Sequence, residues 1–148
     1  MTAPPAAAVA ELLLFTVGGE WFGVPLAAAE EALEELPLEP LPGMPAGMLG
    51  VAPLRGQMLS VYATRPLLGV APADGARVTL IVRGGGARVG LLIDDVEDVL
   101  VTDLAMLRPV PGAGGADPVL RGVTAQDGRL VAVCDPEALV RACRRGRA

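Results

Sequence analysis

The class of fold is decided by residues 78–93, which read Val-Thr-Leu-Ile-Val-Arg-Gly-Gly-Gly-Ala-Arg-Val-Gly-Leu-Leu-Ile. Two short apolar runs, Val78–Val82 and Ala87–Ile93, lie on either side of three consecutive glycines. Short runs of aliphatic and β-branched residues indicate strands, and glycine supplies the positive φ angles of a tight turn. We therefore expect a long β-hairpin. A Walker A phosphate loop is excluded, because that motif needs a lysine and the sequence has none.

Further pairs of short apolar runs occur on both sides of this hairpin, each interrupted by a turn signal. The Asp127-Gly128 signal suits a type I′ turn. The paired runs are Glu11–Val17 with Glu20–Val24, two stretches within Gly47–Tyr62, and Val119–Ala125 with Leu130–Cys134.

Two helices are also predicted. Ala27–Leu36 consists mainly of alanine, leucine and glutamate, which are strong helix formers, so one or two helical turns are expected there. A C-terminal helix should begin after Asp135, which can act as its N-cap, with Pro136 in the first turn. Its apolar face should dock onto a sheet, and consists of Pro136, Leu139, Val140 and Cys143.

Many short strands and little helix are typical of an all-β barrel or sandwich. Loops rich in proline and glycine at 70–76 and 109–118 divide the strands into groups, so two small barrels that share an interface satisfy the pattern. We expect a flexible N-terminal tail at residues 1–10, one domain of two β-subdomains at 11–142, and a basic tail at 143–148.

Missing residue types narrow the function. The chain has no histidine and no lysine, and its only cysteines are Cys134 and Cys143. Histidine is the commonest general base and metal ligand, and two cysteines alone form neither a zinc site nor a Cys–His nucleophile. We expect two buried, reduced thiols, no catalytic residue, no metal and no cofactor. The sequence therefore predicts a protein that is not an enzyme.

Charge and hydropathy limit the partners and the location. The net charge is −5, and the 12 arginines are scattered apart from a group at the C-terminus, so no nucleic-acid partner is expected. The N-terminus lacks the basic start of a signal peptide, and no apolar run is long enough for membrane insertion. We therefore expect a cytoplasmic protein. The C-terminal group suits the negative end of a helix dipole and consists of Arg141, Arg144, Arg145 and Arg147.

A cluster of carboxylates follows the long hairpin, and we expect the second strand of that hairpin to continue through it, over residues 94–101. Alternate residues of an extended strand share a face, so Asp95 and Glu97 would point one way. The opposite face would carry Asp94, Val96 and Asp98. The spacing of an EF-hand is missing, so a solvated or partner-facing edge is favoured over a calcium site. A small ligand- or cation-binding β-barrel is the alternative function from another class.

Leu54-Arg55-Gly56 places a charged residue inside a β-like stretch. It is either a surface arginine at a strand bend or an arginine anchor at a protein interface, where arginine is enriched. At this stretch the chain resembles the CheW-like family, the adaptors of bacterial chemosensory systems. The resemblance spans about residues 11–142. Its motifs are Phe22-Gly23-Val24, Gly50-Val51-Ala52-Pro53-Leu54-Arg55-Gly56, the run from Val89 to Val99, and Leu107-Arg108-Pro109-Val110-Pro111.

The resemblance implies two small five-stranded SH3-like β-barrels packed together, with a C-terminal helix. It implies an adaptor that couples the cytoplasmic tip of a chemoreceptor, a methyl-accepting chemotaxis protein, to a CheA-like histidine kinase. This adaptor would have no chemistry of its own and would be recruited to receptor clusters. The receptor-binding residues it implies are Glu31, Gly50, Val51, Leu54, Arg55 and Gly56. A second set for the kinase or another partner comprises Ile93, Asp95, Val96 and Val99.

The chain departs from the family pattern near this motif. Pro53 stands where the family usually has asparagine, while Ser60 and Ala63 stand where it has proline and aspartate. These departures suggest an alternative, a divergent accessory adaptor that binds the receptor but not the kinase.

Overall fold

The computed structural model describes residues 9–110 and 119–145. Most of the tail expected at 1–10 and of the loop expected at 109–118, together with the end of the basic tail, lies outside these residues. Within them, strand β1 already begins at Val9, and helix α2 includes Cys143 and Arg144, the first residues of the expected basic tail.

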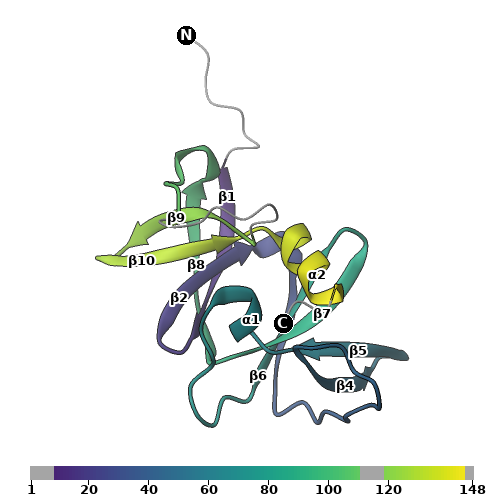
Figure 1. Ribbon diagram of the computed structural model, residues 1–148. Coiled ribbons are helices and arrows are strands. Elements are labelled where there is room, and N and C mark those ends of the chain that lie inside the picture. The colour runs from purple at the N-terminus through teal and green to yellow at the C-terminus, as the bar shows by residue number, and fades with distance from the viewer. Residues whose placement is uncertain (1–8, 111–118, 146–148) are drawn as a thin grey trace.

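The strands form two five-stranded sheets, shown one above the other in Figure 1. The terminal lobe has the strand order β8-β1-β2-β10-β9, with β1 Val9–Val17, β2 Glu20–Pro25, β8 Asp95–Asp103, β9 Leu120–Gln126 and β10 Arg129–Cys134. The central lobe has the order β3-β6-β7-β5-β4, with β3 Ala29–Glu34, β4 Met48–Leu54, β5 Gln57–Tyr62, β6 Val78–Gly84 and β7 Ala87–Ile93. Helical segments connect these strands: η2 Leu26–Ala28, α1 Arg65–Leu68, η3 Leu104–Met106 and α2 Pro136–Arg144.

The expected architecture of two five-stranded β-subdomains with a C-terminal helix is confirmed. Among the described residues the two hydrogen-bonded ladders are open, since they end at β8 and β9 in one lobe and at β3 and β4 in the other. The three hairpins predicted from glycine-containing turns are present as β1–β2, β6–β7 and β9–β10, and the two β-like stretches expected within Gly47–Tyr62 form a fourth hairpin, β4–β5.

The two lobes repeat one topology. Each contains one parallel pair, β10 with β2 and β5 with β7, and each has a hairpin at the same end of its sheet. The turns of those hairpins match: Arg55 and Gly56 have φ angles of 50° and 79°, and Asp127 and Gly128 have 51° and 79°. Two positive φ angles in a two-residue loop define the type I′ turn, which fits the right-handed twist of paired strands.

A second feature shared by the lobes is a covered edge. Residue Glu39 forms a bridge to Val51 of β4, and Arg108 forms one to Val123 of β9. A glycine precedes each bridged valine, because a side chain there would clash with the bridging segment. A Cβ on Gly50 would lie 2.9 Å from the Glu39 carbonyl oxygen, and a Cβ on Gly122 would lie 2.6 Å from the Arg108 carbonyl oxygen. These bridges satisfy backbone groups that an edge strand otherwise leaves unpaired.

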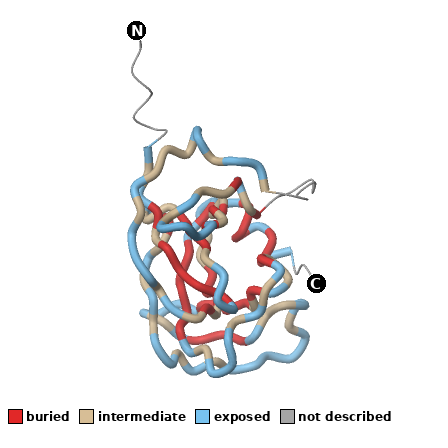
Figure 2. Tube along the Cα trace, turned by 90° about the vertical axis from the view of Figure 1, so that its left-hand side faces the viewer, coloured by how far each residue is buried: buried red, intermediate tan, exposed pale blue. Residues whose placement is uncertain are grey.

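The largest core lies between the lobes. It combines residues of the terminal sheet, such as Phe15 and Phe22, with residues of the central sheet, such as Leu80 and Leu91, and with Leu139 of α2. The rings of Phe15 and Phe22 are stacked with centroids 5.8 Å apart. Figure 2 shows the buried segments concentrated in the interior and the exposed ones along the outside. The two sheets therefore bury their apolar faces mainly against each other.

Each lobe also has a small interior of its own. Leu12, Leu14, Val131 and Val133 fill that of the terminal lobe, and Leu59, Val61 and Ile81 fill that of the central lobe. So few buried side chains supply little hydrophobic free energy compared with the conformational entropy of ordering a lobe. The shared core is therefore what stabilises both lobes.

The prediction of helix α2 is confirmed. The Asp135 side chain accepts hydrogen bonds from the backbone N–H groups of Glu137 and Ala138, as an N-cap should. The helix contacts the central lobe closely at Gly84, where a Cβ would lie 2.4 Å from the Pro136 carbonyl oxygen. Glycine at this position lets the C-terminal helix, which follows the terminal lobe in the chain, lie against a hairpin of the central lobe.

The helix predicted for Ala27–Leu36 is wrong. Only Leu26–Ala28 is helical, as a single 3-10 turn, and Ala29–Glu34 forms strand β3. β3 pairs with β6 and packs Leu33 against the central-lobe interior. Helix propensity differs by less than about 1 kcal/mol per residue between common residues. Pairing with β6 and burial of the Leu33 side chain therefore override the helix propensity of this segment.

The expected continuation of the long hairpin strand into the acidic run is also wrong. The chain leaves the central sheet at Asp94, and Asp95–Asp103 forms β8 at the edge of the other lobe. Val96 lies opposite Phe15 and Asp98 opposite Leu14, with a register shift between them. Because Phe15 and Leu14 are adjacent in β1, they face opposite sides, so the simple alternation expected for the carboxylates does not hold.

The shared core predicts a single cooperative unfolding transition. Replacement of Phe15 by alanine should cost about 3–5 kcal/mol, because it opens a cavity in contact with both sheets. Trp21 fluorescence, which reports the terminal lobe, and hydrogen exchange of β6 and β7 amides should show the two lobes losing stability together. Val9→Ala on the same strand, where the side chain is 51% exposed, should change stability little. Independent unfolding of one lobe would contradict a shared core.

The two thiols should be unreactive in the folded protein. Cys134 and Cys143 are free and buried, and burial raises the pKa of each thiol to about 12 from an ordinary 9.0. Because only the thiolate attacks a disulfide reagent, DTNB should label the native protein slowly and the urea-unfolded protein quickly. Stability should be unaffected by these groups below pH 9 and should fall as pH rises from 9 towards 12. Rapid labelling without unfolding would show that the thiols are accessible.

Candidate protein-interaction site

The β4–β5 turn presents Arg55 to solvent. Arg55 has a left-handed backbone, with φ of 50°, and its side chain is 63% exposed. Its guanidinium forms a bidentate ion pair with Glu31 of β3, in which Nη2 donates to Oε2 at 3.0 Å and Nη1 donates to Oε1. The planar fork of arginine matches the two oxygens of a carboxylate, so this pair fixes the orientation of the guanidinium. The sequence separation is 24 residues, and only the sheet brings the two groups together.

A second set of hydrogen bonds holds the same turn from its other side. Arg88 of β7 donates to the Gln57 side chain at 2.8 Å and to Glu30 at 3.4 Å. Glu30 also accepts from Arg83 of β6 at 2.6 Å. The turn is therefore tied through side chains to β3 and β7, and these ties position the exposed Arg55.

The six residues of the predicted receptor-binding set fall into two groups. Glu31, Arg55 and Gly56 lie at the surface of the turn and of β3, the strand at the opposite edge of the same sheet. Val51 is buried and Leu54 packs partly against the central-lobe interior. Gly50 is held against the Glu39 backbone. The second group therefore shapes the hairpin, and the first group is available to a partner.

The second predicted set lies mostly on the other lobe. Ile93 is fully buried in the shared core, so a partner cannot contact its side chain while the lobes are packed. Asp95 is exposed at the start of β8, Val96 packs partly against the shared core, and Val99 is 41% exposed. Together with exposed Val101, Val99 gives the β8 edge an apolar surface.

Sequence reasoning missed a pair of apolar residues at the lobe ends. Met58 follows the β4–β5 turn and Leu130 follows the β9–β10 turn, and both are largely exposed. They occupy equivalent positions, one residue into the second strand of each matching hairpin. The sequence shows each of them as an apolar residue close behind a turn. Its position does not match the alternation of buried residues along its strand. Leu130 borders a hollow of about 350 Å³ whose other lining residues are Met106, Arg108, Val123, Thr124 and Ala125.

Three of the carboxylates after the long hairpin accept hydrogen bonds from backbone N–H groups, whereas Glu97 accepts one from the Thr16 hydroxyl. Asp94 accepts hydrogen bonds from the N–H groups of Gly19 at 3.1 Å and Ala73 at 2.6 Å, and so joins the β1–β2 turn to the loop before β6. Asp95 and Asp98 each accept from the N–H of the following residue. Within residues 9–110 and 119–145, no group of three or more His, Cys, Asp or Glu side chains is placed to hold a metal ion.

The described chain thus consists of two joined β-lobes with charged and apolar residues presented on hairpin turns, an architecture suited to a protein-binding module. No helix in the described ranges is long and apolar enough to cross a bilayer.

Comparison with known proteins identifies the family. Residues 11–144 match the CheW-like domain. The chain is 32% identical over 133 residues to a probable chemotaxis protein CheW from Rhizobium etli, covering 87% of this chain and 86% of the relative. It is 31% identical over 133 residues to a chemotaxis protein CheW from Rhizobium meliloti, with the same coverage. The crystal structure of the scaffolding protein TtCheW from Thermoanaerobacter tengcongensis superposes with a TM-score of 0.75 at 20% identity, covering 88% of this chain and 91% of that one. The chain belongs to the CheW-like family of chemotaxis adaptor proteins.

The Glu31–Arg55 pair should be visible in the titration of Glu31. The hydrogen bond from Arg55 holds the pKa of the Glu31 carboxyl below its ordinary value of 4.5, and the same bond raises the pKa of Arg55. The pair should therefore favour the folded state above the ordinary carboxyl pKa and lose this effect as pH falls through the lowered value. In an NMR titration, Arg55→Gln should raise the pKa of Glu31, and Arg77→Gln, which removes the partner of Glu35, should leave it unchanged. An unchanged Glu31 titration in Arg55→Gln would show that the pair does not form in solution.

Proposed function

We propose that this protein couples the cytoplasmic tip of a chemoreceptor to a CheA-like histidine kinase in the cytoplasm, as a scaffold with no chemistry of its own. Membership of the CheW-like family supports the class of function. The observation that carries the proposal is the exposed Arg55, held by Glu31 on a turn that a second arginine also ties down. An arginine that is both exposed and oriented is suited to anchor a protein partner.

The receptor-binding surface would consist of the β4–β5 turn and the part of β3 that the Glu31–Arg55 ion pair joins to it. A partner that contacts Arg55 meets a side chain whose conformational entropy is already reduced by the ion pair, so binding orders less of it. Glu31 adds a carboxylate that a donor on the partner can share. Gly50 and Val51 would act indirectly, by fixing the hairpin through the bridge to Glu39.

The kinase-binding surface would lie away from this turn. The proposed contacts on the β8 side are Asp95, Val96 and Val99. Ile93 is not among them, because its side chain is buried in the core. Leu130 adds an exposed apolar side chain at the end of the terminal lobe, whereas Met58 adds one beside the receptor-binding turn. Apolar residues beside a polar rim are typical of protein interfaces. Two separate surfaces are what a coupling protein needs to hold both partners at once.

The structure explains how the chain tolerates one departure from the family pattern. Pro53 is exposed in β4, which is an edge strand of the central lobe. Proline removes a backbone donor, and this loss is least costly at an edge strand. The accessory adaptor that binds receptor alone is the second candidate, because Pro53, Ser60 and Ala63 all lie in the hairpin and connection that would contact a partner.

Binding of a purified receptor tip should depend on the arginine. Arg55→Ala should weaken binding by about 1–3 kcal/mol if Arg55 is an anchor, measured by calorimetric titration. Arg77→Ala is the matched control, because Arg77 is equally exposed and forms an ion pair with Glu35 on the same lobe. Equal affinity of wild type and Arg55→Ala would exclude this anchor.

The same titration with the regulatory domain of the kinase separates the two candidates. Binding of both partners supports the coupling protein, and binding of the receptor tip alone supports the accessory adaptor. Binding of neither, with a small ligand detected by native mass spectrometry, would overturn both.

A further inference from the structure

Helix α2 exposes a face that is almost entirely cationic. Pro136 is half-buried, and Ala138, Leu139, Val140, Ala142 and Cys143 are buried against the lobes. The exposed residues of the helix and its C-cap are Glu137, Arg141, Arg144 and Arg145. The exposed residues of this segment therefore comprise three arginines and one carboxylate, in a chain whose net charge is −5. A helix dipole favours cations at this end, but only by about 0.3–1 kcal/mol for each surface charge.

These side chains border a hollow between α2 and the β6–β7 turn. The hollow has a volume of about 400 Å³ and is lined by Gly84, Gly85, Glu137, Val140, Arg141, Arg144 and Arg145. The turn opposite the arginines contributes only glycine here, so no side chain from the central lobe fills the space. The close approach of Gly84 to Pro136 fixes the helix against the hairpin and keeps this geometry.

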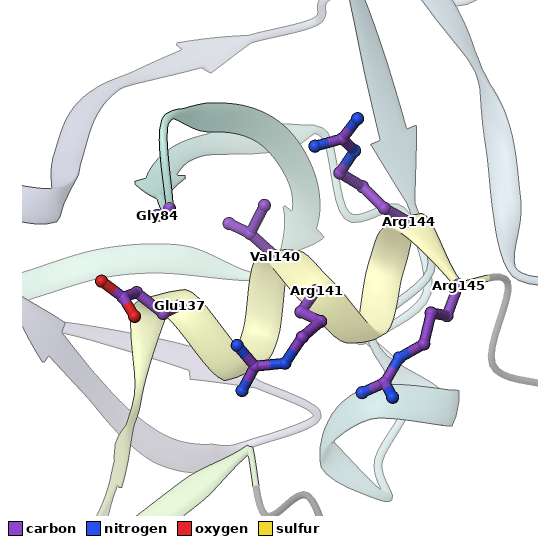
Figure 3. Close-up of a pocket in the computed structure, with 7 residues that line it drawn as sticks. Gly84, Glu137, Val140, Arg141, Arg144 and Arg145 are labelled. Atoms are coloured by element: carbon purple, nitrogen blue, oxygen red, sulfur yellow. The ribbon is translucent and has the colours of Figure 1, made fainter.

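The directions of the arginines exclude a site for one small anion. In Figure 3, Arg141 and Arg145 extend from one side of α2, whereas Arg144 extends from the other. A single phosphate or carboxylate is held by donors that converge on it, and these donors diverge. Their arrangement instead fits several anionic groups spaced along the helix.

We propose that the exposed face of α2 is a docking surface for an acidic segment of a partner protein, separate from the β4–β5 turn. Arg141 and Arg145 are one helical turn apart, or about 6 Å along the axis. Alternate side chains of an extended segment are about 6.6 Å apart, so two carboxylates on such a segment can reach both arginines. Arg144 approaches the same segment from the other flank. Arg141 and Arg145 already interact with other groups of the chain, and the acidic segment adds to these interactions.

This surface goes beyond the receptor and kinase surfaces, since none of its residues belongs to β3, β4, β5 or β8. Charge complementarity identifies the occupant. The hollow is open and three of its seven lining residues are arginines, which suits a flexible acidic segment better than an uncharged peptide.

The test uses a labelled peptide of alternating glutamate and alanine, with glutamine replacing glutamate in the control peptide. NMR spectra of the full chain should show shifts at Gly84, Gly85 and residues 137–145 on addition of the acidic peptide only. The variant R141Q/R144Q should weaken binding by about tenfold or more, as expected for removal of two charged contacts. Binding should also weaken between about 50 mM and 300 mM salt, because screening acts strongly on exposed charges.

Matched controls keep the outcome decisive. Arg121→Gln changes an exposed arginine of β9 and should leave peptide binding unchanged. Thermal melting should show that R141Q/R144Q is folded, and receptor-tip binding by this variant should be unaltered. The proposal would be overturned if the glutamine peptide bound as tightly as the glutamate peptide, or if the NMR shifts were confined to arginines outside α2. It would also be overturned if inorganic phosphate competed at the same concentration as the peptide.

Discussion

The packing of two sheets on one shared core is the constraint on which the rest of this molecule depends. Neither lobe buries enough side chains to be stable alone, as the small groups around Leu12 and Leu59 show. Phe15 and Leu91 belong to different sheets and to the same core, and α2 closes that core from the side. Every exposed turn is therefore carried on a scaffold that folds as one unit, and the separation between binding surfaces is fixed by how the lobes pack.

The repeated topology gives the molecule two equivalent hairpin ends with different chemistry. The β4–β5 end carries Arg55 in its turn, and the β9–β10 end carries Asp127 at the matching position with the same φ angle. Each is followed by an exposed apolar residue, Met58 or Leu130. The same turn geometry thus carries a cationic residue in one lobe and an anionic residue at the matching position of the other.

Much of the candidate site was accessible to prediction, because the turn signals are local. Asp127-Gly128 is recognisable in the sequence as a turn, and family resemblance pointed to Glu31 and Arg55, although Arg55 was expected inside a β-like stretch and not in a turn. Resemblance did not reveal that these two residues pair, or that Arg88 and Gln57 hold the turn from its other side. Those contacts join residues far apart in the chain, and no local pattern encodes them. For the same reason, Ile93 was expected at a surface although it lies in the core.

The hairpins, the capped C-terminal helix and the lack of histidine and lysine follow from the amino-acid sequence alone, since each depends on residue identity or on neighbours a few positions apart. Long-range packing, in contrast, makes Ala29–Glu34 a strand and carries β8 to the other lobe. It also brings the paired arginines to their carboxylate partners. The reason is one of magnitude: local preferences are worth less than about 1 kcal/mol per residue, and pairing with an existing strand or burial of an apolar side chain exceeds that.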